Sequence, residues 1–396
     1  MSRNFSDWLQ AYVEYASFSE APKRMHFWSG VAAIAGALRR KVWIDMAYFK
    51  WYANHYIVFV APPGIVSKST TVSIAVDLLR RVPGINFGPD IVTWPALVTA
   101  FASSSEAFEL DGEFVTQCAL TLESSEFGNL VNPSDRDMLD LLITLWDCKT
   151  GALKKMTKGS GNDTIENPWI NMVACTTPSW IAGNFPEHVI GGGFTSRCLF
   201  IYTDKKDKLV AYPHLSVPTG LKHQATLLAT DLEFMSKNLL GAYTLEPEAL
   251  EWGKIWYTSH YARPPDGLED DRFGGYLARK QTHIHKLAMV IAASQRDSLI
   301  IRADDLALAN TMVSDLEQDM PKVFAKIGKS VQANQVERFV NFVRAKVVGV
   351  PYAVAYQFVH QYFPDARNIE GIFNGAIRAG LVEIIAKDGI PWLRSK

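Results

Sequence analysis

Apolar and polar residues follow one another along the chain in blocks that predict helices and strands. Apolar residues recur at helical spacing between residues 5 and 40, with Pro22 separating two helices. The run His55–Val60 is apolar and aromatic on both faces, which is typical of a strand buried in a sheet. A helix is predicted over residues 69–81, ending before a Pro-Gly break. The order is therefore strand, glycine-containing loop and helix.

Further apolar runs at residues 115–122, 169–175 and 198–203 alternate with helical segments. Such alternation predicts an α/β fold, in which a sheet is covered by helices on both sides. From about residue 223 to residue 325 the spacing of apolar residues is helical.

The C-terminal stretch predicts a small separate domain. Helical patterns at 336–347, 352–363 and 365–379 precede two short apolar segments that flank Lys387-Asp388-Gly389, a hairpin turn signal. Three helices followed by a β-hairpin form a winged helix-turn-helix. We therefore expect a helical N-terminal segment (1–45), an α/β core (46–220), a helical subdomain (221–330) and a terminal winged helix (334–396).

Composition narrows the class of protein. The chain has 396 residues, of which 48% are hydrophobic, and a formal net charge of −1. A near-neutral chain gives little long-range attraction for nucleic acid, so any such contact must come from local patches. The four cysteines form no CxxC pair, which argues against a zinc site or a disulfide framework.

No targeting or membrane segment is evident. No run approaches the ~18 apolar residues of a membrane span. The first residues also lack the apolar centre of a signal peptide. We therefore expect a cytoplasmic protein, in a bacterial host cytoplasm, with no membrane partner.

The segment APPGIVSKST, residues 61–70, carries the candidate nucleotide-binding chemistry. A phosphate-binding loop needs inward backbone N–H groups, a Lys that reaches the β- and γ-phosphates, and a Ser or Thr hydroxyl on Mg²⁺. The positive end of the following helix adds to the attraction. Lys68 and Ser69 fit these roles. The candidate nucleotide-binding residues are Pro63, Gly64, Ile65, Val66, Ser67, Lys68, Ser69 and Thr70.

The glycine spacing of this loop departs from the GxxxxGK[ST] pattern. Ser67 stands where the pattern has its second glycine, and Pro62 stands where it has its first. A plain loop with a helix-capping Ser69 is the alternative interpretation.

Two carboxylates follow the next predicted strand, which ends at Leu122. In P-loop ATPases an acidic residue here assists the metal, and another polarises the attacking water. Glu126 is the candidate catalytic glutamate, and Glu123 is a candidate metal-assisting residue alongside Ser69. Surface carboxylates after a strand are also common without any such role.

Two later segments offer groups that could contact the γ-phosphate. The strand ending at Cys175 is followed by Thr176 and Thr177, and Thr177 is taken as a catalytic candidate that senses phosphate or orients water. A glycine-rich stretch leads to Arg197, which could act across a subunit boundary as an arginine finger. The alternatives are a strand-end turn and a structural salt bridge.

Lysines gather in the segment between the second and third of these strands. Lys154, Lys155 and Lys158 lie in a predicted hairpin or loop that could follow the phosphates of single-stranded DNA without reading sequence. A solvated charged loop is the alternative. In the winged helix, Arg367, Arg378 and Lys387 are further candidate phosphate contacts.

The order APPGIVSKST, LESSEFGNL, NMVACTTPSW and GGGFTSRCLFIY resembles a family of phage and prophage helicase-like ATPases, often described as primase-helicase C-terminal regions. The resemblance covers about residues 20–320. It implies a P-loop NTPase core of the RecA/AAA+ type, ATP and Mg²⁺ as cofactors, and a ring-shaped homo-oligomer, expected to be a hexamer, that works on DNA with replication proteins. Ser67 replaces the loop glycine, and Ser125 stands where related sequences commonly have Asp; either change could slow hydrolysis.

We therefore expect an ATP-dependent helicase or translocase that acts on single-stranded DNA in phage or mobile-element replication. One alternative is an ATP-binding DNA-binding or helicase-loader protein with little turnover. Another is a packaging or defence ATPase that acts on double-stranded DNA.

Overall fold

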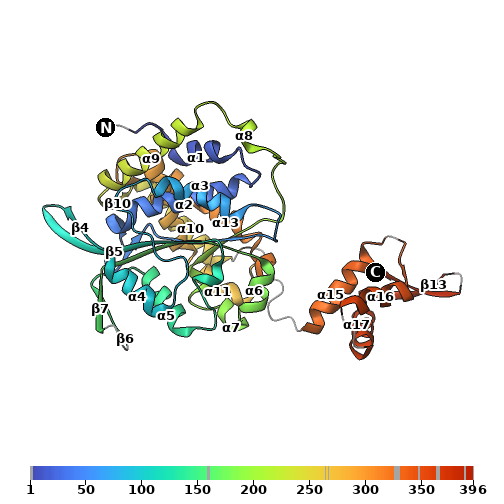
Figure 1. The fold of residues 1–396 in the computed structure, drawn as a ribbon. Helices are drawn as coiled ribbons and strands as arrows, with labels where there is room; N and C mark the ends of the chain where they lie inside the picture. Colours follow the sequence, from blue (N-terminus) through green and yellow to red (C-terminus); the bar gives the residue numbers. More distant parts are fainter. Residues whose placement is uncertain are drawn as a thin grey trace. The chain divides into compact units, whose positions relative to one another are not determined.

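The computed structural model describes residues 3–157, 161–263, 265, 267–324, 331–346, 348–362, 366–387 and 389–395. The chain divides into two compact units, Met1–Ala325 and Lys326–Lys396. The larger unit is a mixed α/β structure with a central sheet between two layers of helices, as the alternating pattern predicts (Figure 1). Within the described part of the chain, no helix is both long and apolar enough to cross a bilayer.

The central sheet has five strands in the order β4-β5-β8-β3-β9. Their bounds are β3 (Tyr56–Val60), β4 (Ser105–Leu110), β5 (Glu113–Ser124), β8 (Pro168–Thr176) and β9 (Cys198–Tyr202). All neighbours are parallel except β4 and β5. Every residue of β3 and β8 is buried, because helices cover both faces of the sheet.

The parallel strands end together at one edge of this sheet, which we call the carboxyl edge. Val60, at the end of β3, is paired with Thr176 of β8 and with Tyr202 of β9. The strands begin at the opposite, amino edge. The two edges are roughly 15 Å apart, because β3 has five residues at about 3.3 Å each.

One helical layer contains α1 (Trp8–Ala16), α2 (Lys23–Leu38), α3 (Lys68–Leu79) and α9 (Leu221–Asn238). Helix α2 is mostly buried and packs closely on α3. A Cβ atom at Gly36 would lie 2.4 Å from Cδ2 of Leu79, so a larger residue here would force the Leu79 side chain to move. The other layer contains α4 (Trp94–Ser103), α5 (Arg136–Trp146), α6 (Pro178–Asn184) and α7 (Glu187–Ile190) (Figure 1).

A second sheet ties the N-terminal segment to the region after residue 220. Its order is β11-β10-β1-β2, with bounds β1 (Val42–Asp45), β2 (Lys50–Tyr52), β10 (Gly241–Leu245) and β11 (Ile300–Ile301). The remaining helices are α8 (Pro213–Ser216), α10 (Pro247–Ala262), α11 (Gly274–Leu277), α12 (Lys280–Gln295), α13 (Ala303–Glu317) and α14 (Met320–Phe324). Because β1 pairs with β10, the first 325 residues form one compact unit rather than three successive parts.

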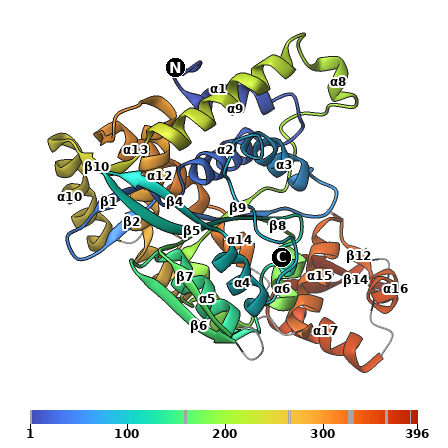
Figure 2. The ribbon, with the colours of Figure 1, turned by 60° about the vertical axis from the view of Figure 1, so that its left-hand side comes forward.

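A hairpin of β6 (Ala152–Thr157) and β7 (Gly161–Glu166) joins α5 to the start of β8. It lies against β5 and α4, as Figure 2 shows. Since β8 begins at the amino edge, the hairpin extends from that edge.

The smaller unit contains three helices and a hairpin, as its sequence predicts. The elements are α15 (Val331–Arg344), β12 (Val350–Pro351), α16 (Tyr352–Tyr362), α17 (Ala366–Arg378), β13 (Val382–Lys387) and β14 (Ile390–Ser395). The short strand β12, which the sequence did not predict, pairs with β14. Phe339, Phe373 and Leu393 lie in the hydrophobic core of the smaller unit.

Candidate active site

The loop of residues 61–67 joins β3 to α3 at the carboxyl edge. Gly64 has a φ of +72°, a left-handed conformation that favours glycine, and no atom lies within 4 Å of a Cβ built there. The N–H of Ile65 donates to the carbonyl of Pro62 at 3.4 Å. Gly64 is therefore favoured by the backbone conformation of the turn, although the standard phosphate-loop pattern allows any residue at this position.

Ser67, which replaces the second glycine of the pattern, has a φ of −81°. This value suits any L-residue, so the backbone here does not require glycine. Ser67 is at the N-cap position of α3, but no side-chain hydrogen bond caps the helix, and Ser69 lies within its first turn. The helix-capping interpretation of this loop therefore lacks its expected hydrogen bond.

Lys68 is the first residue of α3, and its amine donates to the carbonyl of Ala61 at 3.0 Å. The neighbouring Ser69 hydroxyl is exposed and has no hydrogen-bond partner among the described residues. The backbone N–H groups of Gly64, Val66 and Ser67 also find no acceptor in the described chain. Unpaired donors beside a helix N-terminus are suited to bind an anion.

Cys175, near the end of β8, shows that three candidate charges lie near one another. Burial raises the pKa of its thiol to about 12, the nearby Lys68 lowers it, and the nearby Glu123 and Glu126 raise it. The three charges come from α3, from β5 and from the turn after β5, and β8 lies between β3 and β5. The fold thus brings the predicted lysine and both predicted carboxylates to one end of one strand.

The two carboxylates differ in their surroundings. Glu123 accepts a hydrogen bond from Arg80, the residue that follows α3, at 2.8 Å and one from the Ser73 hydroxyl of α3 at 3.4 Å. Glu126 is exposed, and its carboxylate has no partner among the residues described. The Ser124 hydroxyl donates to the backbone carbonyl of Glu126 at 2.8 Å and accepts from its N–H at 3.2 Å, which fixes the turn that presents this carboxylate.

The hydroxyls after β8 also differ. Thr177 caps α6 by accepting from the N–H of Trp180 at 3.1 Å, which is the strand-end turn that the alternative describes. Thr176 is buried, and its hydroxyl has no hydrogen-bond partner in the described residues. Its carbonyl accepts from the N–H of Ala61 at 3.3 Å, so Thr176 lies directly beside the loop.

Arg197 occupies a 3₁₀ helix (Thr195–Arg197) just before β9, at the amino edge. Its guanidinium pairs with Asp147 at 2.8 Å and donates to the carbonyl of Gly193 at 2.7 Å. Its side chain is only 7% exposed. These contacts are the structural salt bridge that the alternative describes, and the arginine-finger role of Arg197 stays a prediction.

The lysine cluster lies in the expected hairpin. Lys154 and Lys155 belong to β6, where their backbones are opposite Thr164 and Asp163, whereas Lys158 lies outside the described residues. In the smaller unit, Arg378 ends α17 and the Lys387 amine lies 4.8 Å from the centre of the Trp392 ring. The side chain of Arg367 is outside the described part of the structure.

The described residues contain no group of three or more His, Cys, Asp or Glu that could hold a metal ion. Mg²⁺ at nucleotide sites usually takes one or two protein ligands and completes its shell with phosphates and water. The exposed Ser69 hydroxyl fits such a site because its oxygen is available. Glu123 could assist only in addition to its pairing with Arg80.

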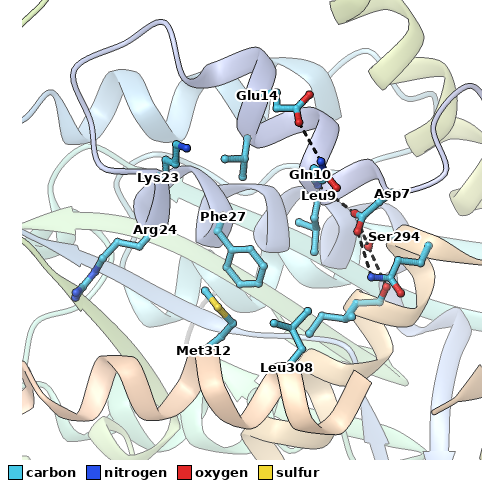
Figure 3. A pocket seen from close by; sticks show the side chains of 13 residues that line it. Asp7, Leu9, Gln10, Glu14, Lys23, Arg24, Phe27, Ser294, Leu308 and Met312 are labelled. Atoms are coloured by element: carbon cyan, nitrogen blue, oxygen red, sulfur yellow. Dashed lines mark hydrogen bonds between the residues drawn. The ribbon is translucent and has the colours of Figure 1, made fainter. Parts of the chain in front are cut away.

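A hollow of about 490 Å³ lies among α1, α2, α12 and α13, and none of the predicted site residues lines it (Figure 3). Leu9, Phe27, Leu308 and Met312 give it an apolar lining. Asp7 is already bonded to Ser294 at its rim. The hollow offers little polar chemistry, so the candidate site remains at the carboxyl edge.

No protein-family model matches the chain, and no curated protein sequence matches it.

Sequence reasoning missed two residues that face the site. Ser73 follows Ser69 by one turn of α3, and Arg80, the C-cap residue, comes about three turns after Ser69, so all three lie on one side of the helix and its end. The spacing of these polar residues in the sequence indicated a polar helix face. That Ser73 and Arg80 bond to Glu123 could not be predicted without the fold. Thr176 was considered beside Thr177. The hydroxyl of Thr176 is buried and has no partner among the described residues, whereas that of Thr177 caps α6.

Proposed function

We propose that the chain is a P-loop ATPase that binds ATP with Mg²⁺ at the carboxyl edge and hydrolyses it there. The observation that carries the proposal is the convergence of Lys68 and Glu126 around the end of β8, next to a loop with unpaired backbone donors. Neither residue type nor spacing alone requires that convergence.

Each residue has a defined role in this proposal. The backbone donors of the loop and the Lys68 amine bind the β- and γ-phosphates, and the Ser69 hydroxyl binds Mg²⁺. Glu126 holds the attacking water, because its carboxylate is free and lies beyond the strand next to β8. Thr176, with its unpaired hydroxyl, lies between the loop and the carboxylates and donates to the γ-phosphate.

The Lys68 amine would have to exchange its bond to Ala61 for a phosphate oxygen. Such an exchange replaces a bond to a neutral carbonyl by a stronger bond between charged groups. The side chain of Lys68 is only partly buried, so it can turn without disrupting the core.

The proposal extends to movement along single-stranded DNA by a ring-shaped homo-oligomer, as in phage or mobile-element replication. Its support is the position of the hairpin of β6 and β7, which we call the lysine hairpin because β6 carries Lys154 and Lys155. The hairpin continues into β8, so one strand joins it to the candidate site. The three helices and hairpin of the smaller unit supply a second domain of a kind that binds DNA or proteins.

A second candidate is a nucleotide-dependent loader or DNA-binding protein with little turnover. It is favoured by two ion pairs, because Arg80 holds Glu123 and Asp147 holds Arg197. Groups held in this way do not reach a nucleotide without rearrangement.

The deciding experiment measures ATP binding and ATP turnover with and without single-stranded DNA, together with the mass of the assembly. Turnover that rises with single-stranded DNA supports the motor. Tight ATP binding with negligible turnover supports the loader. Absence of ATP binding at any magnesium concentration would sink both.

A further inference from the structure

A recess lined largely by polar residues lies in the larger unit, at the amino edge of the central sheet. Its volume is about 450 Å³, within the usual range for small-molecule sites. Five cationic side chains and one carboxylate line it. The cations are Lys50, Lys149, Arg197, Arg279 and Lys286, and the carboxylate is Asp147. We call this the cationic recess.

Two of these cations are built into the interior. Lys286 is 2% exposed; its amine lies 3.5 Å from the centre of the Trp146 ring and donates to Asn54 at 2.7 Å. Arg197 is held by Asp147, so the one carboxylate of the recess is already engaged. Burial lowers the pKa of Lys286 to about 7, and a bound anion would oppose that shift.

Two further cations have no carboxylate partner among the described residues. Lys149 is exposed at the rim, and Arg279 is half-buried with a single long hydrogen bond to the carbonyl of Gly275 at 3.3 Å. Burial and the nearby Arg197 lower the pKa of Arg279, which indicates that the two guanidinium groups face the same space. Asp45 lies 4.0 Å from Lys50 and Asp147 pairs with Arg197, so among the described residues the excess positive charge of the recess is that of Lys149 and Arg279.

Aromatic rings border this charge. Phe49 is 52% exposed, and its ring centre lies 5.6 Å from that of Trp51, which also lines the recess. Both belong to the turn and strand around β2, as does Lys50. The other cations come from α12 and the residue before it, from the segment after α5 and from the 3₁₀ helix before β9. Cations beside exposed aromatic faces are the usual combination in sites for single strands, where bases stack and phosphates pair with Lys or Arg.

We propose that the cationic recess binds single-stranded nucleic acid, with a phosphate between Lys149 and Arg279 and a base against Phe49. A duplex does not suit this geometry, because its bases are already stacked on one another and cannot reach a ring inside a recess. Lys149 also lies just before β6 in sequence, so a strand that leaves the recess would continue onto the lysine hairpin.

This inference deepens the proposed motor function but does not depend on ATP hydrolysis. The recess is at the amino edge, whereas the candidate nucleotide site is at the carboxyl edge. Binding of an oligonucleotide without ATP therefore tests the recess alone, and ATP binding by the same variants tests the other site.

The experiment measures the affinity of fluorescent oligo-dT for the full chain over a range of salt concentrations. In the variant Lys149→Ala/Arg279→Ala we expect affinity to fall about tenfold or more, and the slope of log K against log salt to fall by about 1.4, because two phosphate contacts are lost. Phe49→Ala should weaken binding about tenfold and leave the slope unchanged, since it removes stacking without removing charge. ATP binding should be unchanged in both.

The matched control is Lys222→Ala/Lys237→Ala, which removes two exposed cations from α9. Equal affinity and slope in the control and in the recess variant would overturn the proposal. A variant that loses ATP binding but keeps oligo-dT binding would also overturn it, because the recess would then be a mononucleotide site. Equal competition by duplex DNA would rule out a single-strand site.

Discussion

The Lys68 amine donates to the carbonyl oxygen of Ala61, 3.0 Å away at the start of the same loop. The bond joins the end of the loop to its start, and it persists until an anion competes for the Lys68 amine. Since the N–H groups of Gly64, Val66 and Ser67 have no acceptor in the described chain, this bond is the main internal contact that a nucleotide has to replace.

Lys68→Ala should weaken ATP binding at least about tenfold, because a charged hydrogen bond to phosphate is lost. The melting temperature should change little, since the lost bond joins a half-buried amine to its own loop. Isothermal titration with ATP and Mg²⁺ measures the first effect and calorimetric melting the second. Lys205→Ala, an exposed lysine after β9, is the control and should bind ATP normally.

Glu126→Gln should leave ATP binding intact and slow hydrolysis about 100-fold or more, because the amide cannot accept a proton from water. The exposed carboxylate of Glu126 has no partner to lose in the described structure, so folding should not be affected. Single-turnover kinetics with radiolabelled ATP gives the rate. Unchanged turnover would remove Glu126 from its assigned role.

Arg80→Met tests whether the ion pair with Glu123 restrains a metal-assisting carboxylate. We expect half-maximal turnover at a lower Mg²⁺ concentration, since the freed carboxylate can attract the cation. The unfolding free energy should fall by no more than about 1 kcal/mol, because Arg80 is well exposed. Glu123→Gln should shift the Mg²⁺ requirement in the opposite direction, and the same shift in both variants would contradict the assignment.

Replacing Lys154, Lys155 and Lys158 with Ala should weaken single-strand binding and lower its salt slope by about 2, at roughly 0.7 per phosphate contact. ATP turnover without DNA should persist, since the hairpin extends from the edge opposite Lys68. Fluorescence anisotropy with oligo-dT at several salt concentrations is the measurement. An unaltered slope would leave the hairpin as a solvated loop.

Three buried histidines should make the protein less stable in acid. Burial is the main cause that lowers the pKa of His26, His283 and His285 to about 4, against 6.5 for an ordinary histidine. Between those pH values the unfolded chain binds more protons than the folded chain, so the free energy of unfolding falls as the pH drops from 6.5 towards 4. Each histidine adds at most about 1.4 kcal/mol per pH unit. Urea denaturation over this pH range should show the slope, and His285→Gln should reduce it.

Local pattern was sufficient to predict most of the fold. The doubly buried run at residues 55–60 became β3, and the KST segment opened α3, because both depend on neighbours in sequence. The strands β10 and β11 were missed within a region predicted as helical. They are short and pair with β1 and with each other, which local periodicity does not reveal.

The site was only partly predictable for a related reason. Lys68, Glu123 and Glu126 could be placed at strand ends from sequence, but Arg80, the partner of Glu123, is distant from it along the chain. Arg197 illustrates the difference, since its contact with Asp147 spans fifty residues and could not be assigned from the sequence around it. The isolated Lys286 within the apolar stripe of α12 was a readable signal for the cationic recess, because a lysine so placed must have a reason to be buried.

Strand β8 has nine residues, all buried, and is hydrogen-bonded to strands on both sides. A strand held in this way has little freedom to stretch or to slide along its neighbours. In the proposed motor, a push on Thr176 from a bound phosphate would therefore be delivered at Pro168, where the lysine hairpin is attached. The central strand would then transmit the displacement as a rigid element. The size of the movement at the hairpin would be set by how far β8 tilts, and not by how far any loop bends.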